Sequence, residues 1–407
     1  MVTHPQPGET MRTSNPTRHN DAGTAIAEAT HAIESHLIAI RRDLHAHPEL
    51  AFEEVRTAGV VAAELARLGI PHQTQVGRTG VVGTIVGGRP GPTLAIRADM
   101  DALPIQERTG QAFASTVEGK MHACGHDIHT STLLGVAAVL AGMAPQLSGT
   151  VRLLFQPAEE AIGGAAAMIA DGALEGVDMA LGFHNAPGMP TGRFGYTRGA
   201  SLAAADRIEF TVTGVSGHAA HPYSAVDPIV AACHLVTQLQ TVVSREQRPI
   251  HPCVVTIGAI HAGTANNIIP DACVLRGTVR TLHEAARNTA EASIGRLCAG
   301  IEVGMRVKID YVYTRGAPSL VNDDGVLDRL RAAVEAQFGA VIDEGEPSMG
   351  AEDFALMSQL VPAAHLRVGA SQPGRRDKLH NSDYQPDEGS IRAGVQALSR
   401  AALEMLS

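Results

Sequence analysis

Five short segments carry side chains that could bind a metal ion or transfer a proton. They are Asp99-Met100-Asp101, Cys124-Gly125-His126, Glu159-Glu160, His184-Asn185 and the single His380. Three of them closely follow runs typical of β-strands (TLAIRA, VRLLFQ and MALGF), and His380 comes some ten residues after a fourth run, AHLRVGA. Ligand and catalytic groups of open α/β sheets gather beyond the carboxyl ends of strands. We therefore expect these segments to meet in one site.

The spacing of Cys124 and His126 limits where the next helix can begin. Side chains two residues apart diverge on a helix but share a side in an extended segment, so the helix predicted by STLLGVAAVL should start after both. Taken alone, a buried structural cysteine and a hydrogen-bonded loop histidine would explain the pair equally well. Together with carboxylates and imidazoles from the other segments, the pair favours zinc or another first-row transition ion over calcium or magnesium.

Glu159 and Glu160 are adjacent, so their carboxylates diverge and should do different work. In metal-assisted hydrolysis an ion lowers the pKa of a water, and a free carboxylate accepts its proton. One glutamate could bind the ion and the other could accept the proton, although the spacing does not say which. The alternative is an acidic pair that caps the helix after it.

The predicted elements that position these residues form an α/β fold with an insertion. Residues 1–24 predict a disordered, polar tail, and residues 25–205 predict the first part of a catalytic α/β domain in which strands alternate with helices. Residues 206–314 have the order βαββαβ of a ferredoxin-like domain. Residues 315–407 return to α/β character, so we expect the catalytic domain to be split around an inserted lid and dimerisation domain.

Composition excludes several classes of function. The 407 residues hold 32 Lys and Arg against 42 Asp and Glu, a net charge of 32 − 42 = −10, and only 3% aromatic residues. Neither nucleic-acid binding nor attraction to an anionic membrane is expected from such a chain. Five cysteines, an odd number, argue against a disulfide framework and for a reducing compartment. With no long apolar run and no signal-like start, the expected location is the cytoplasm.

Ten motifs from about residue 25 to the C-terminus resemble one family. In chain order they are RRDLHAHPELAFEE, RADMDALPI, MHACGHDIHT, FQPAEE, GFHN, SGHAAHP, NNIIP, GTVRT, GAEDF and LHNSDY. The chain is similar in these motifs to the aminoacylase, hippurate hydrolase and indoleacetyl-amino-acid hydrolase family of two-metal peptidases. The resemblance implies a two-ion catalytic domain and an inserted lid that also forms a homodimer.

The resemblance also implies roles for single residues. The implied metal ligands are Cys124, His126, Glu160, His184 and His380, with Cys124 bridging two divalent ions. Glu159 would be the general base, and Asp101 would only orient its neighbours. In the lid, His218 would polarise the scissile carbonyl, reaching the site of a partner subunit, while Asn267 and Arg280 would hold the oxyanion or the substrate carboxylate. Distant relatives have His-x-Asp where this chain has Asp99-Met100-Asp101, which leaves the role of Asp99 open.

The sequence therefore predicts a metal-dependent hydrolase of the amide bond of N-acyl-L-amino acids, small-molecule substrates. Zinc or manganese suits the donor set best, and cobalt or nickel is compatible with it. The alternatives within the enzyme class are a deacetylase of N-acetyl-diaminopimelate type and a dipeptidase. A metal-binding module without turnover is the alternative outside it, but it would leave no use for a carboxylate beside the ligands such as Glu159.

Overall fold

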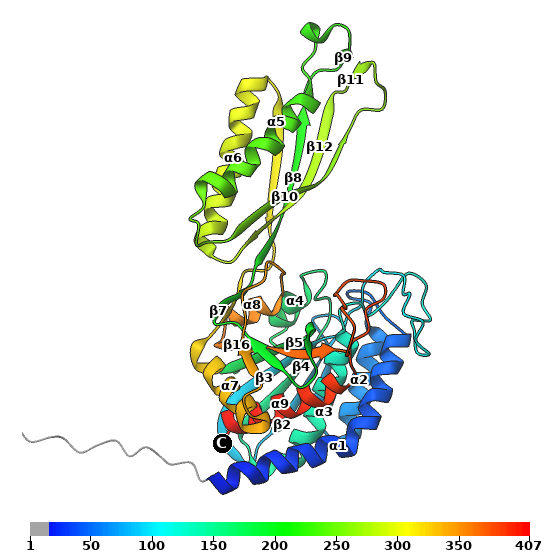
Figure 1. The fold of residues 1–407 in the computed structure, drawn as a ribbon, viewed down its shortest axis with the longest axis vertical. Helices are drawn as coiled ribbons and strands as arrows, with labels where there is room; N and C mark the ends of the chain where they lie inside the picture. Colours follow the sequence, from blue (N-terminus) through cyan, green and yellow to red (C-terminus); the bar gives the residue numbers. More distant parts are fainter. Residues whose placement is uncertain (1–15) are drawn as a thin grey trace, which may run out of the picture.

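The structure is a computed structural model that describes the backbone of residues 16–407, with side chains from residue 21 on. It has a large α/β domain and a smaller domain at one end (Figure 1). Helix α1 (Pro16–Ala46) already begins at residue 16, so the predicted disordered tail is wrong for residues 16–24, and residues 1–15 lie outside the described part. Proline is favoured in the first turn of a helix, and a helix nucleated by its amphipathic part extends readily into polar residues.

The large domain is built on an eight-stranded sheet of order β1-β2-β4-β3-β5-β16-β6-β15. Its strands are β1 (His72–Val76), β2 (Gly80–Val86), β3 (Arg89–Asp99), β4 (Ser148–Gln156), β5 (Met179–Pro190), β6 (Phe194–Tyr196), β15 (Ile342–Glu344) and β16 (Ala363–Ser371). The four central strands β4, β3, β5 and β16 are parallel. A short antiparallel pair, β7 (Gly199–Leu202) with β14 (Leu320–Asn322), lies outside this sheet. The predicted α/β class is confirmed.

Helices cover both faces of the sheet. One core joins it to α1, α2 (Val55–Arg67), α3 (His126–Met143), α7 (Asp324–Phe338) and α9 (Gly389–Met405), and a second core joins the other face to α4 (Gly164–Ala170) and α8 (Phe354–Ser358). Strand β3 shows the alternation that this requires, since Leu94 and Ile96 enter the first core and Ala95 the second. The central strands are thus buried on both sides.

One helical segment, His126–Gln146, is long and apolar enough to span a membrane by length and composition alone. Of its apolar window, 72% is buried inside the protein, between α1, α9 and strand β3. That burial is typical of the central helix of an α/β domain, and it explains the apolar character of the segment.

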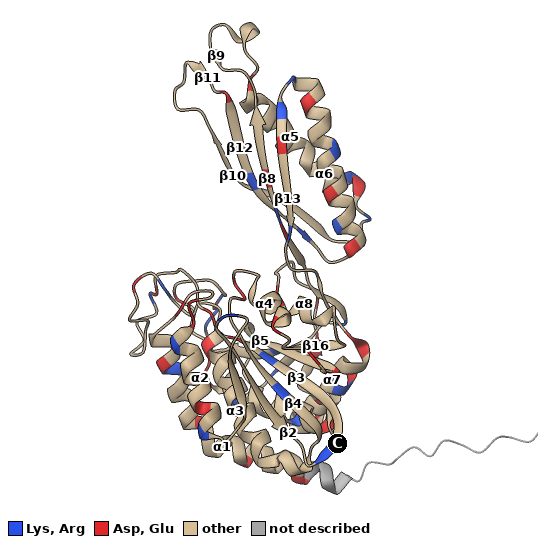
Figure 2. Cartoon of the chain, turned by 180° about the vertical axis from the view of Figure 1, so that it is seen from behind, with Lys and Arg blue, Asp and Glu red and all other residues tan. Residues whose placement is uncertain are grey.

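The smaller domain, which we call the lid, has strands and helices in the order β8 (Ala204–Thr213), α5 (Pro228–Thr241), β10 (Cys253–Ala262), β12 (Ala272–Thr281), α6 (Glu284–Met305) and β13 (Lys308–Arg315). Its antiparallel sheet has the order β10-β12-β8-β13, and both helices pack on one face over an apolar core. The view from behind shows charged residues along the outer side of α6 (Figure 2). At the far end, β9 (Gly217–His218) and β11 (Ile268–Ile269) form a small ribbon.

The two crossings into and out of the lid are tied together at its base. The buried carboxylate of Asp206 on β8 accepts hydrogen bonds from Arg287 Nε at 2.9 Å, Tyr313 Oη at 2.5 Å and the Gly316 amide at 3.0 Å. Because these partners come from α6, from β13 and from the strand's exit, this cluster holds both connections to the large domain in one place.

Candidate active site

Cys124 and His126 are presented by a tight turn at the start of α3. Gly125 between them has φ 88°, the left-handed region, and a Cβ there would lie 2.4 Å from Nδ2 of Asn185. Only glycine fits such a position without strain. The helix begins at His126 itself, whereas the sequence predicts a start after that residue, and the turn lets the Cys124 thiol and the His126 ring enter the same site.

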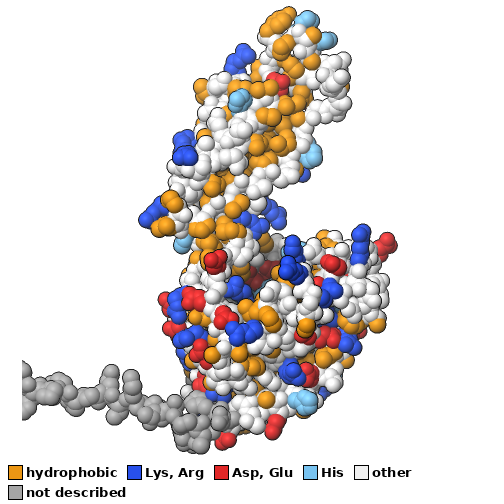
Figure 3. Space-filling model, viewed as in Figure 1, with side chains coloured by type: hydrophobic (Ala, Val, Ile, Leu, Met, Phe, Trp, Pro, Cys, Tyr) orange, Lys and Arg blue, Asp and Glu red, His pale blue; other side chains and the backbone are white. Residues whose placement is uncertain are grey.

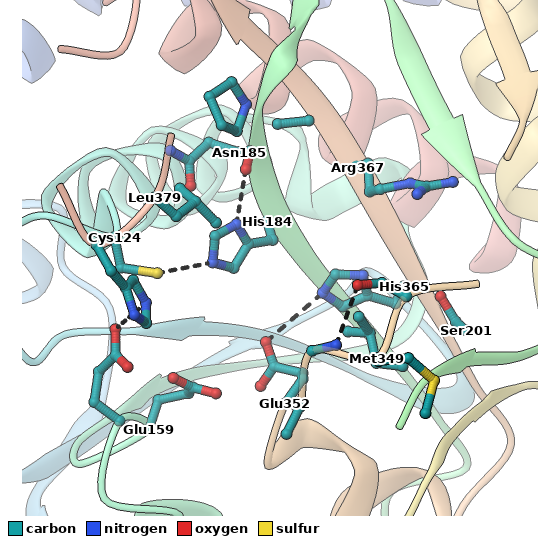
Figure 4. A pocket seen from close by; sticks show the side chains of 18 of the residues that line it. Cys124, Glu159, His184, Asn185, Ser201, Met349, Glu352, His365, Arg367 and Leu379 are labelled. Carbon is teal, nitrogen blue, oxygen red and sulfur yellow. Dashed lines mark hydrogen bonds and ion pairs between the residues drawn. The ribbon is translucent and has the colours of Figure 1, made fainter. Parts of the chain in front are cut away.

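His184 faces the same thiol from strand β5. The sequence places His184 after its strand, but β5 continues to Pro190, so the residue lies inside it. Nδ1 of His184 donates to the carbonyl oxygen of Asn185 at 2.8 Å, and Nε2 lies 3.3 Å from Sγ of Cys124 (Figure 4). Burial lowers the pKa of His184 to about 3, so the ring is neutral near pH 7 and presents the Nε2 lone pair to Cys124.

Asp101, just after β3, organises the loop that carries the two glutamates. Its carboxylate accepts the backbone amides of Glu159 at 3.0 Å and Glu160 at 3.1 Å. Its Oδ1 also lies 3.3 Å from Nδ1 of His126, which turns Nε2 of that ring toward the site. Asp101 contacts backbone and ring rather than open space, in agreement with an orienting role.

Glu160 and His380 close the other side of the site. Nε2 of His380 lies 3.2 Å from Oε1 of Glu160, and the backbone amide of His380 donates to the carbonyl oxygen of Ala123 at 2.8 Å. This backbone contact brings a residue from the C-terminal part of the chain beside the Cys124 turn. The hydrogen bond to Glu160 raises the pKa of His380.

The donor atoms of these residues fit metal ions. Two groups have their donor atoms within 4.8 Å of one another, Cys124 with His126 and His184, and Cys124 with Glu160 and His380. Nε2 of His126 is buried and has no hydrogen-bond partner among the described residues. Protein interiors seldom leave such an atom unpaired. Cys124 belongs to both groups, so its sulfur is the atom that two ions could share.

Glu159 lies beside these donors but is surrounded by other carboxylates. Burial, followed by the charges of Glu352 and Asp353, raises its pKa well above the usual value. A carboxylate in such surroundings holds a proton more tightly than an ordinary glutamate, which suits a group that accepts a proton and then returns it.

Beneath Glu159 lies a fully buried arginine that the sequence analysis did not single out. Arg97 donates to Asp99 at 2.7 Å and to Asp353 at 2.9 Å and lies 2.8 Å from Glu352. Asp99, whose role the sequence left open, also accepts from Nδ1 of His129 at 2.6 Å. These contacts make Asp99 part of a buried charge cluster behind the donors.

The donors open into a cleft of about 1010 Å³ between the two domains. Figure 3 shows the surface hollowed between lid and large domain, with acidic side chains inside the hollow. Arg280 and Val254 line the cleft from the lid. His218 and Asn267 do not, since they lie on the ribbon at the far end of the lid, where the Ala219 amide donates to the Asn267 carbonyl oxygen at 3.1 Å.

Two more cleft residues, His365 and Arg367, were missed by the sequence analysis. In the parallel pairing of β5 with β16, His365 lies opposite Gly182 and Arg367 opposite His184. Paired residues of neighbouring strands project from the same face, so both side chains share the face of His184 (Figure 4). The alternation along AHLRVGA places His365 and Arg367 on one face of the strand. The pairing of β16 with β5 is needed to identify that face as the one that carries His184.

Comparison with known proteins places the chain in a family. The model of Peptidase family M20/M25/M40 matches residues 95–404. The N-acetylcysteine deacetylase of Bacillus subtilis is 39% identical over 93% of this chain and 99% of its own, and the hippurate hydrolase of Campylobacter jejuni is 38% identical over 90% and 96%. The crystal structure of a dinuclear metal-binding peptidase of Bacillus subtilis superposes with a TM-score of 0.82 at 36% identity, covering 92% and 99%.

Proposed function

Because the chain belongs to Peptidase family M20/M25/M40 and is an amidohydrolase, we propose that it hydrolyses the amide bond of N-acyl-L-amino acids. The products would be a carboxylate and a free amino acid. N-acetylcysteine and hippurate, the substrates in the names of two relatives, are both N-acyl amino acids. Family membership confirms the resemblance found in the motifs and removes the alternative of a metal-binding module without turnover.

The observation that carries this proposal is the place of Glu159. One of its oxygens lies within 4.8 Å of donor atoms of His126 and Glu160, in the wall of the cleft. We assign Glu159 as the general base: it accepts a proton from the attacking water and passes it to the nitrogen of the leaving amino acid. Burial, together with the carboxylates of Glu352 and Asp353, favours its protonated state, which suits a group that carries the proton from the water to the amine.

Two divalent ions would be held by Cys124, His126, Glu160, His184 and His380, with Cys124 in common. Such ions supply Lewis-acid chemistry, lowering the pKa of a water and stabilising negative charge. Mixed sulfur, nitrogen and oxygen donors suit zinc or manganese. Asp101 keeps His126 and the glutamate loop in place through the contacts described above.

The lid residues complete the proposal. Arg280 lines the cleft and would bind the substrate carboxylate. His218 and Asn267 lie too far along the lid to line the cleft of their own chain, so they would act in the site of a second copy within a homodimer, where His218 would polarise the scissile carbonyl. This assignment makes the dimer the active form.

The test is release of free amino acid from a panel of N-acetyl, N-benzoyl and long-chain acyl amino acids, N-acetyl-diaminopimelate and dipeptides. We expect turnover of the monoacyl amino acids, and a loss of roughly 10²- to 10⁴-fold in kcat for Glu159→Gln with metal content unchanged. Chelation should abolish turnover, and zinc or manganese should restore it. Equal rates for wild type and Glu159→Gln would overturn the mechanism, and turnover of dipeptides alone would overturn the substrate class.

A further inference from the structure

Two arginines of the large domain, Arg97 and Arg367, lie near the cleft. Of these two, only Arg97 forms ion pairs with described residues. Arg97 lies against three carboxylates at 2.7 to 2.9 Å. Arg367 has no ion pair with any described residue. Burial alone shifts its pKa, downward, and no neighbouring carboxylate opposes that shift. Arg367 is half-buried, and a guanidinium that is partly removed from water is stabilised by a paired anion.

Among the described residues, Nη2 is the guanidinium nitrogen of Arg367 that has hydrogen-bond partners. Nη2 donates to the carbonyl oxygen of Tyr196 at 3.0 Å and to Oγ1 of Thr197 at 3.0 Å. Nε is buried without a hydrogen-bond partner among the described residues. Gly345 leaves room for this group, since a Cβ there would lie 2.1 Å from Nη2. The side chain is therefore fixed in position with donors to spare.

The neighbours of Arg367 in the cleft have polar, uncharged side chains. Figure 4 shows His365 and Ser201 on the same side of the cleft as Arg367, away from Cys124. Nε2 of His365 is buried without a hydrogen-bond partner, 3.9 Å from a Glu352 oxygen. Glu352 is paired with Arg97 at 2.8 Å. Among the described residues no carboxylate forms an ion pair with Arg367, so this side of the cleft offers donors to an anion.

Two arginines line the cleft, one from each domain. Arg280 projects from lid strand β12 and also lacks an ion pair among the described residues, while Arg367 is fixed on β16, one strand from His184. The α-carboxylate of an N-acyl amino acid neutralises one of them. Arginine binds carboxylates in a bidentate geometry, so the second is suited to another carboxylate.

We propose that Arg367, with His365 and Ser201 beside it, is an anion-binding position of the cleft, and that the preferred substrates carry a second carboxylate in addition to the α-carboxylate. This inference rests on the proposed function, because it names the class of N-acyl amino acid within it. The second carboxylate belongs either to the amino-acid side chain or to the far end of a dicarboxylic acyl group, and both present the same chemistry to the guanidinium.

Two matched substrate pairs separate these sources. N-acetyl-L-glutamate is compared with N-acetyl-L-glutamine, and N-succinyl-L-leucine with its terminal amide, N-succinamoyl-L-leucine. We expect wild type to favour the dianion of at least one pair in kcat/KM by roughly 10- to 100-fold, the usual range for a charged hydrogen-bonded contact. The pair that shows the preference locates the second carboxylate.

The variants test whether Arg367 causes the preference. Arg367→Met should remove it while changing turnover of the neutral member only a few-fold, and Arg367→Lys should keep part of it. Arg198→Met is the matched control, since Arg198 has its own partners Asp324 at 2.8 Å and Asp328 at 2.7 Å and does not line the cleft. Equal kcat/KM within both pairs, or a preference that survives in a folded Arg367→Met, would overturn the inference and leave the proposed function intact.

A binding measurement keeps the inference testable if no substrate of the panel is hydrolysed. In the Glu159→Gln background, calorimetry should show tighter binding of the dianion than of its amide partner, and the difference should vanish with Arg367→Met. Absence of hydrolysis would count against the proposed function only. Equal affinities in calorimetry would count against the anion-binding position.

Discussion

The large domain and the lid treat charged side chains in opposite ways. Behind the donors, the large domain buries Arg97, Asp99 and Asp353 together with the donor histidine His126. Of the described lid residues, only Asp206 and Arg287 are charged and buried, and they lie at its base. The rest of the lid core is apolar. The large domain thus holds the candidate metal ligands and Glu159 together in its interior, whereas the candidate residues of the lid lie on its surface.

The two domains therefore differ in where their candidate functional residues lie. Residues inside the large domain act through contacts that the chain makes with itself. His218 on β9 and Asn267 just before β11 are exposed, so the roles proposed for them depend on what approaches the lid. The predictions below test this difference, ordered by the expected change in free energy.

The largest effect is expected from Arg97→Met. It would leave Asp99, Glu352 and Asp353 without their counter-charge in the interior, which typically costs about 3–5 kcal/mol. The free energy of unfolding by denaturant measures it. If Arg97→Met lowers the free energy of unfolding no more than substitution of an exposed arginine does, these carboxylates take up protons and do not need Arg97.

His218→Ala tests the surface of the lid. If His218 stabilises the oxyanion, its loss should lower kcat by roughly 10²-fold or more without changing stability. Mixing His218→Ala with Glu159→Gln should restore up to about a quarter of wild-type activity, because a mixed symmetric dimer keeps one intact site. No recovery after subunit exchange would mean that His218 does not act in the site of a second copy.

The pH dependence of stability tests the burial of His365. Burial lowers its pKa to about 3, whereas in the unfolded chain it takes up a proton near pH 6.5. The unfolded state therefore binds more protons between these values, and wild type should lose up to about 1.4 kcal/mol of stability per pH unit on acidification relative to His365→Phe. Parallel stability curves from pH 6.5 to 4 would contradict this.

The smallest effect is expected for a surface pair of the lid, Arg276 with Glu209, at 2.8 Å. Both side chains are exposed, so solvent screens the pair and Arg276→Met should cost about 0–1 kcal/mol. Thermal unfolding of this variant beside Arg97→Met measures the contrast between the domains directly. A large loss would show that the lid depends on its surface charges more than its apolar core indicates.

The sequence predicts the candidate donors that the fold brings together, but it does not predict the residues that lie behind them. Cys124, His126 and Glu160 stand in short clusters whose residue types indicate metal chemistry without knowledge of the fold. Arg97 lies inside the run TLAIRA. The alternation of a strand cannot distinguish an arginine that faces solvent from one that is buried against a carboxylate 255 residues away, which here is Glu352. Arg367 was missed for the same reason, because its meaning depends on the pairing of β16 with β5.

The six main elements of the lid follow the order βαββαβ that the sequence predicts, because each of them is long and regular. The start of α1 and the length of β5 were not predicted. The ends of helices and strands carry weaker sequence signals than their interiors.

The sulfur shared by the two donor groups ties the protein to the redox state of its surroundings. Cys124 has no disulfide partner among the described residues, and burial raises the pKa of its thiol. Addition of oxygen to that one atom would remove a donor from both groups at once. The raised pKa keeps the thiol protonated and less reactive toward oxidants, which protects the one atom on which both groups depend.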